Sequence, residues 1–160
     1  MVLIITMATF ASFVFTTCLL LIYAVFDLRT RKVPNQVLLI GGIVGFGVVL
    51  RFGHIVDYAI LHLTAALVAL ILGYILFRIG AFGGADVKVL FTIAIISPGI
   101  EFTSWGNPIM EGILAVGLQL VITLTIGYLI AQRRTEGTEP IPLIPILLGA
   151  YLVLQLLALF

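Results

Sequence analysis

The sequence predicts an all-α membrane protein with six transmembrane helices and its N-terminus outside. Three observations carry this prediction. The 160 residues are 62% hydrophobic and 9% charged, with a mean hydropathy of +1.32, whereas about a quarter of the residues of a soluble domain are charged. Most of the apolar residues form runs close to the length of about 20 residues that crosses a bilayer. The few basic residues collect in alternate loops between these runs.

The apolar runs define one polytopic domain over residues 1–160. Its expected spans are 2–26, 36–52, 58–77, 88–98, 112–131 and 141–160. The fourth span is short: roughly a dozen residues make about 18 Å of helix, against an apolar core of about 30 Å. It either crosses as a short helix or re-enters. In the second span, Gly41 and Gly45 are four residues apart, a spacing that permits close helix contact.

The basic residues favour six crossings. If all six segments cross, the loops 27–35, 78–88 and 132–141 share one side of the membrane. That side then holds seven of the eight basic residues: Arg29, Arg31, Lys32, Arg78, Lys88, Arg133 and Arg134. A re-entrant fourth segment would move the last two outside and weaken this bias. The positive-inside rule therefore predicts a multi-pass protein of the cell membrane whose basic loops are cytoplasmic.

Several protein classes are excluded by composition. The formal net charge of +1 leaves no basic surface for nucleic acid. The single cysteine, Cys18, lies in an apolar run, so the chain offers neither a disulfide nor a Cys-x-x-Cys zinc site. The partner that composition does predict is the lipid bilayer.

The sequence gives no strong reason to place five other ionisable residues in a functional site. His62, within the third span, is expected to pack as a polar or interfacial side chain, since one histidine without partners makes a poor metal site. His54, Asp57 and Glu101 lie near outer loops and are expected to be solvated. Glu111 adjoins the fifth span and could face a cavity, although nothing near it in sequence pairs with it.

Asp27 and Asp86 stand apart from these residues. Asp27 ends the first span in YAVFDLRTRKVPN, and Asp86 precedes the fourth in GAFGGADVK. With six crossings, both acids lie at the cytoplasmic face at similar depth. Two carboxylates that share a site cannot both ionise cheaply, so one can accept a proton from water while the other donates one to a scissile carbonyl. The glycines before Asp86 remove side chains that would obstruct an extended substrate.

Other interpretations of the two acids remain open at this point. Asp27 can pair with a neighbouring basic side chain, and Asp86 can cap the fourth helix. A small transporter or channel could use both carboxylates to bind a cation, although transport sites usually lie near the membrane midplane. A non-catalytic assembly protein held by glycine-mediated helix contacts is a third possibility.

Three segments resemble the type IV prepilin peptidases. DLRTRKVPN, residues 27–35, resembles the D-x-x-x-R-x-[IV]-P-N segment that follows the first helix of that family. GGADVK, residues 83–88, resembles the family signature G-x-G-D-x-K, with Ala85 in place of the second glycine, as is frequent among the archaeal preflagellin and prepilin peptidases. IPLIPILLG, residues 141–149, resembles the proline-rich start of the last helix of the family.

The resemblance implies a membrane aspartyl endopeptidase of the GxGD type. Such enzymes cut short basic leaders from prepilin, pseudopilin or archaellin precursors at the cytoplasmic membrane face. Asp27 and Asp86 match the two catalytic acids. The remaining matches are expected to shape the approach to the acids (Gly83, Gly84 and Ala85) or to support the site (Arg31, Pro34, Asn35 and Lys88). This chemistry requires no metal ion and no organic cofactor.

The same resemblance implies that one activity is absent. Relatives that also methylate the N-terminus of the mature pilin carry an added cytoplasmic segment, commonly with paired cysteines. Here the loop 27–35 is followed at once by the second span, and Cys18 is alone in the first span. The expectation is peptidase activity without N-methyltransferase activity.

Overall fold

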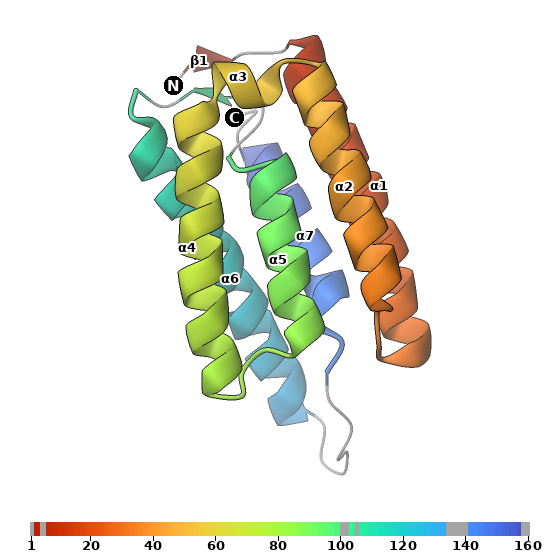
Figure 1. Cartoon of the computed structure of the whole chain (residues 1–160). Coiled ribbons are helices and arrows are strands. Elements are labelled where there is room, and N and C mark those ends of the chain that lie inside the picture. The colour runs from red at the N-terminus through yellow and green to blue at the C-terminus, as the bar shows by residue number, and fades with distance from the viewer. Residues whose placement is uncertain (1, 4–5, 100–102, 105, 134–140, 158–160) are drawn as a thin grey trace.

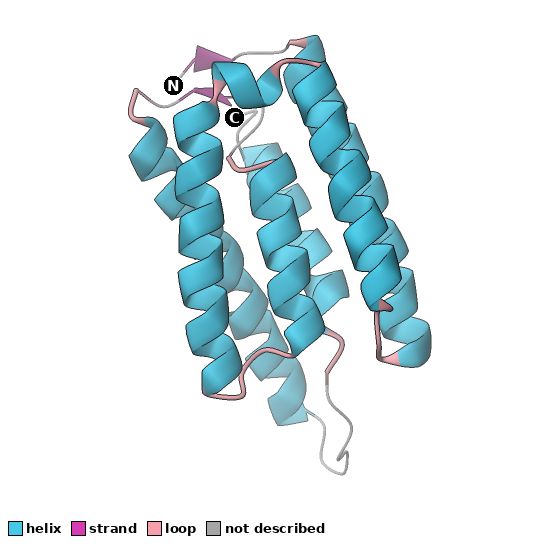
Figure 2. Cartoon of the chain, viewed as in Figure 1, coloured by secondary structure: helices cyan, strands magenta, loops and turns pink. Residues whose placement is uncertain are grey.

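The chain folds into a bundle of helices, which confirms the all-α fold class (Figure 1, Figure 2). The computed structural model describes residues 2–3, 6–99, 103–104, 106–133 and 141–157. The elements follow in the order β1 (Val2–Leu3), α1 (Met7–Thr30), α2 (Asn35–Arg51), α3 (His54–Asp57), α4 (Ala59–Arg78), α5 (Gly84–Ile96), β2 (Thr103–Ser104), α6 (Pro108–Arg133) and α7 (Leu143–Leu157).

Several helix ends differ from the expected span boundaries; α5, for example, begins at Gly84 rather than at residue 88. The first helix begins at Met7 rather than at residue 2, because β1 pairs antiparallel with β2 and the Thr6 side chain then caps the helix. It continues to Thr30, so Asp27 lies inside the helix and not beyond its end. The fifth span begins at Pro108 rather than at residue 112, because the Asn107 side chain accepts two amide hydrogen bonds of the first turn.

Helix length separates two groups of spans. Among the described residues, α1, α4 and α6 are long and apolar enough to cross a membrane. The apolar helices α2 and α7 are shorter, with 17 and 15 residues, and α5 has 13 residues, or about 20 Å of helix. These helices are those of a membrane protein. The count of six crossings stays a prediction, as does the outward N-terminus.

The short helix α5 lies at the centre of the bundle. It packs against α1, α2, α4 and α7, and Figure 1 shows it between α4 and α2 with α7 behind it. Helix α2 makes close contacts at two of its glycines. A Cβ on Gly45 would collide with Ile96 of α5, and one on Gly41 would collide with Tyr23 of α1. The close helix contact expected from the glycine spacing is therefore confirmed.

The C-terminal end of α5 is buried, and side chains of three other helices bind carbonyl groups of its last turn and of the segment that follows it. The Ser12 hydroxyl of α1 donates to the carbonyl of Ile96 at 2.7 Å, and His62 Nδ1 of α4 donates to the preceding carbonyl at 2.7 Å. Gln155 of α7 donates to the carbonyl of Gly99 at 3.1 Å. Carbonyls left without donors in an apolar setting would cost several kcal/mol, so this polar set lets α5 end inside the protein.

The structure corrects the expectation for two histidines. His54 is buried rather than solvated, and its Nδ1 lies 2.8 Å from Nε2 of His62. His62 therefore does have a partner, although it lies eight residues earlier in the chain. Asp57 is exposed, as expected, and Glu111 is buried at the start of α6. Glu101 lies outside the described residues.

Candidate active site

The two acids singled out by sequence lie at the same end of the bundle. Asp27 occupies the last full turn of α1, and Asp86 occupies the first turn of α5. Both ends point downward in Figure 1, toward the short connections from α1 to α2 and from α4 to α5. Residues 59 positions apart in sequence are thus brought to one level by two different helices.

Asp27 is tied to the start of α7. The carboxylate is buried, and its Oδ2 accepts a hydrogen bond from the backbone N–H of Ile144 at 3.2 Å. Ile144 lies between Pro142 and Pro145, which have no N–H, so its amide is one of few donors in this turn. A helix N-terminus favours a negative charge, and α7 thereby fixes the orientation of the Asp27 carboxylate.

Arg31 adds a positive charge beside Asp27. Its guanidinium is close enough to interact favourably with that carboxylate, and its backbone N–H donates to the Asp27 carbonyl at 3.1 Å. Arg31 ends α1 in the left-handed region, with φ of 55°, a conformation that is uncommon for residues other than glycine. The turn reverses the chain so that Pro34 can lead into α2.

Asp86 reaches back over the start of its own helix. Its Oδ2 accepts a hydrogen bond from the backbone N–H of Gly83 at 2.8 Å, so Asp86 does cap α5. A Cβ on Gly83 would lie 3.1 Å from the same oxygen, whereas one on Gly84 would meet only Phe77 at 3.9 Å. The absence of a side chain at Gly83 therefore leaves the Asp86 carboxylate the space that it occupies.

The electrostatic state of Asp86 is perturbed. The residue precedes the expected span 88–98. Its pKa is raised from 3.8 to about 6. Burial is the largest cause, the Gly83 hydrogen bond acts in the opposite direction, and the negative charge of Asp27 adds to the increase. This last effect means that the charge of Asp27 acts on Asp86. Among the described residues, their hydrogen bonds nevertheless go to different backbone amides, those of Ile144 and Gly83.

The loop before Asp86 is buried at Phe82 and exposed at Gly83. Gly80 ends the preceding helix with φ of 77°, which suits glycine, and the amides of Ala81 and Phe82 both donate to the carbonyl of Leu76. The Phe82 side chain is buried in the core, while Gly83 and the residue after it are exposed. Phe82 anchors the loop, a role that its sequence context alone did not indicate.

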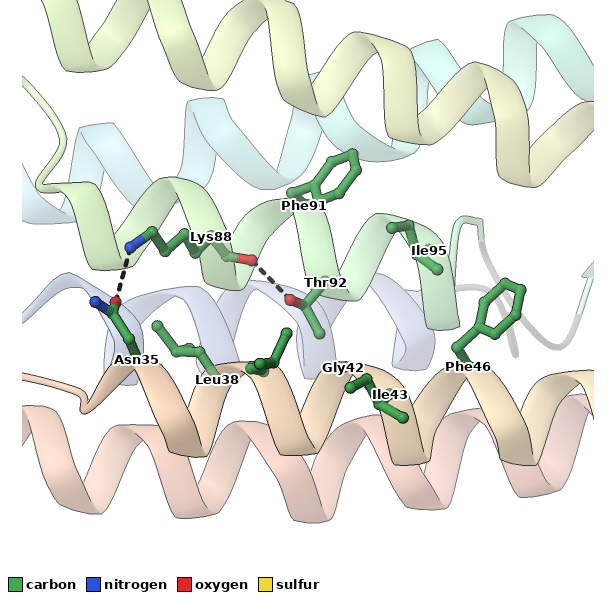
Figure 3. Close-up of a pocket in the computed structure, with 10 residues that line it drawn as sticks. Asn35, Leu38, Gly42, Ile43, Phe46, Lys88, Phe91, Thr92 and Ile95 are labelled. Carbon is green, nitrogen blue, oxygen red and sulfur yellow. Dashed lines mark hydrogen bonds between the residues drawn. The ribbon is translucent and has the colours of Figure 1, made fainter.

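Two further motif positions meet across helices. Lys88 Nζ donates to Asn35 Oδ1 at 2.7 Å, which joins α5 to the start of α2 (Figure 3). Both side chains are exposed at the end of the bundle that carries the acids. Ala85 is half-buried and packs against the hydrophobic core.

Two other described residues with ionisable side chains lie far from this site. His54 and Asp57 bound α3, which closes the opposite end of the bundle in Figure 1. Within the described part of the chain, no three His, Cys, Asp or Glu side chains are grouped so that they could hold a metal ion.

The fold and this site define a class of protein: a helical membrane protein with two carboxyl groups, from two different helices, at one end of the bundle. The chain belongs to the type IV leader peptidase family, whose model matches residues 13–160. This membership supports a leader-peptidase-like protease that acts on pilin-type precursors. No curated protein and no solved structure shows significant similarity to the chain.

Proposed function

We propose that this protein is a membrane aspartic endopeptidase in which Asp27 and Asp86 form the catalytic pair. It removes the short basic leader from type IV pilin-like or archaellin-like precursors and does not methylate the product. The observation that carries this proposal is the placement of two carboxyl groups, from α1 and α5, at one end of the bundle and within electrostatic range. The family match gives that geometry its reaction class.

The proposed reaction is hydrolysis of one peptide bond. Asp27, ionised, takes a proton from a water molecule whose oxygen attacks the scissile carbonyl carbon. Asp86, protonated, donates its proton to the carbonyl oxygen, which gives a tetrahedral diol. The diol collapses when its hydroxyl proton returns to a carboxylate and the leaving nitrogen is protonated, so that the C–N bond breaks. The pKa of Asp86, raised to about 6, supports its assignment as the acid, and the Ile144 amide and Arg31 favour the charged form of Asp27.

The glycines before Asp86 support access to the pair. The exposed stretch at Gly83 and Gly84 presents backbone without side chains next to the carboxylate. The two acids hold separate amides, and we expect them to move toward one water molecule when a precursor binds. The left-handed turn at Gly80 gives the loop a position at which such a movement can occur.

We further propose that residues 1–160 form one domain with six crossings, the N-terminus outside and the active site at the cytoplasmic face of the cell membrane. The support is the charge distribution. The α1, α4 and α6 ends that carry Arg29, Arg78 and Arg133 lie at the end of the bundle that carries the acids. Basic residues at one face orient a membrane protein with that face inward.

A cation transporter built on the same acids has less support. Transport sites typically lie near the midplane between broken helices, whereas Asp27 and Asp86 lie at helix ends on one side. The decisive experiment is cleavage of a precursor. The purified protein in detergent or liposomes is mixed with pilin-like and archaellin-like precursors from the same genome, and the product termini are read by mass spectrometry. A parent protein that cleaves none of them would refute the proposal.

A further inference from the structure

An apolar groove runs between α2 and α5. It has a volume of about 560 Å³, within the range of ligand-binding pockets. Its lining consists mainly of large apolar side chains, among them Leu38, Ile43, Phe46, Phe91 and Ile95 (Figure 3). Along α2 the lining extends from residue 35 to residue 46, or about 16 Å at 1.5 Å per residue. The groove is therefore about three helical turns long.

The groove begins at the end of the bundle that carries the two acids. Among its described lining residues, the charged or amide side chains are Asn35 and Lys88, which form their hydrogen bond at one end. Lys88 lies two residues after Asp86 on α5, so the polar end of the groove is at the level of this carboxyl group, although the two side chains leave different faces of the helix. From this end the lining becomes apolar, which matches the change from membrane face to membrane interior in the proposed topology.

The walls of the groove restrict the backbone conformation of a bound peptide. Both walls are α-helices, whose backbone groups are already hydrogen-bonded and cannot pair with an extended strand. At membrane depth, a peptide with unpaired backbone groups is too costly, so a bound segment must form its own backbone hydrogen bonds as a helix. An apolar helix face that enters such a groove does so through side chains spaced three or four residues apart.

We propose that the groove between α2 and α5 binds the apolar helical segment of the precursor that follows the scissile bond. This inference rests on the proposed function. A short basic leader belongs in water at the cytoplasmic face, so the part of the precursor that descends along the groove is the part beyond the cleavage site. The groove then holds the mature segment while the acids at the same end of the bundle act on the peptide bond before it.

A matched pair of glycines on α2 tests this. A side chain added at Gly42 enters the groove, since its Cβ would lie 3.8 Å from the Thr92 side chain in ordinary contact. Gly47 is on the same helix but outside the groove, and its Cβ would meet nothing within 4 Å. Gly42→Phe and Gly47→Phe therefore differ in whether the new ring fills the groove.

Each variant is assayed on two substrates: a complete membrane precursor, and a soluble peptide that ends shortly after the scissile bond. We expect Gly42→Phe to lower the ratio of kcat/KM for the precursor to kcat/KM for the peptide by roughly 10- to 150-fold, the range expected when a large apolar side chain loses its burial. We expect Gly47→Phe to leave this ratio unchanged. An unchanged ratio in Gly42→Phe overturns the proposal, and so does an equal drop in both variants.

Cross-linking supplies a readout that does not require turnover. Ile43 and Ile40 are both 62% exposed, but only Ile43 lines the groove. A photoreactive benzoylphenylalanine is placed at either position in the Asp86→Asn protein. We expect position 43 to cross-link to the apolar segment of the precursor and position 40 not to do so.

Cross-links from position 43 to lipid alone would mean that the groove holds only acyl chains, and would overturn the proposal. A parent protein that cleaves neither substrate refutes the proposed function and not the groove. Occupation of the groove is then decided by the cross-linking alone.

Discussion

Replacement of Asp86 separates its capping contact from its proposed chemistry. The carboxylate accepts the Gly83 N–H at 2.8 Å, a contact that an asparagine side-chain oxygen can reproduce. Asn and Asp cap helices about equally well, whereas alanine at a cap costs about 1 kcal/mol. We therefore expect Asp86→Asn to retain the cap and Asp86→Ala to lose about 1 kcal/mol of unfolding free energy.

The charge of Asp86 adds nothing to stability at neutral pH. Its pKa is raised from 3.8 in the reference state to about 6 in the folded protein, so the folded state binds a proton more tightly than the unfolded one. This contribution is present below pH 3.8 and is lost as the pH rises through about 6. A neutral asparagine is thus not expected to weaken the fold at pH 7.

Activity should respond very differently. Asparagine cannot donate or take up the catalytic proton, and general acid–base catalysis contributes about 10²- to 10⁴-fold. We expect both Asp86→Asn and Asp86→Ala to lose at least about 10²-fold of kcat, and the Asp27→Asn/Asp86→Asn double variant to be about as slow as either single variant, because such residues act as a unit. The assay is precursor cleavage followed by gel mobility, with thermal unfolding in detergent measured alongside.

The matched control is Asp57→Asn, the same exchange at an exposed residue at the other end of the bundle. It should cleave at the parental rate. An Asp86→Asn protein that processes precursor at near-parental rate would mean that Asp86 serves only as a helix cap. Equal loss of activity in the Asp57 variant would show that the exchange acts through general damage to the fold.

Four further predictions follow from the site and the charge distribution. Gly83→Ala should lower kcat about tenfold or more, because its Cβ at 3.1 Å displaces the Asp86 carboxylate, and Gly84→Ala should lose less; equal losses would contradict the packing argument. The value of kcat/KM should be higher at pH 6 than at pH 8, because the protonated fraction of Asp86 falls above its pKa of about 6; a flat profile across this range would exclude Asp86 as the acid. Cysteines that replace Arg31 or Arg133, in a protein without its native cysteine, should resist an impermeant reagent added outside intact cells, and ready labelling at either position would rule out the proposed topology. The purified protein should transfer no labelled methyl group from S-adenosylmethionine to cleaved precursor, and incorporation of label would refute peptidase activity alone.

The fold class was predictable from local sequence because apolar runs and basic loops are local signals. The start of α6 was also marked: Asn107 before Pro108 is typical of a helix start, with a capping side chain followed by a residue that needs no amide partner. The start of α1 carried a weaker signal, Thr6 three residues before Thr9. The pairing of β1 with β2 had no signal in the local sequence, because it joins segments about 100 residues apart.

The candidate site was predictable only where a motif marked it. Spacing relative to known peptidases identified Asp27 and Asp86, but composition alone left helix capping as an equal alternative, and the structure shows that Asp86 does cap. The Ile144 amide was missed, although the flanking prolines were a signal that few donors remain there. The His54–His62 contact was unpredictable, because two histidines eight residues apart meet only when α3 and α4 are both in place.

The polar contacts at the buried end of α5 bear on how the protein is made. A helix of 13 residues whose last carbonyls face hydrocarbon would be a poor candidate for independent insertion into a bilayer. Ser12 and His62 bind its last carbonyls and Gln155 binds that of Gly99 just beyond it, and these side chains come from the first, middle and last parts of the chain. Insertion of α5 is thus coupled to synthesis of α7, which also supplies the amide that binds Asp27. A nascent chain that has not yet reached α7 lacks the Ile144 amide, so the Asp27 carboxylate takes its final orientation only when the last helix is in place.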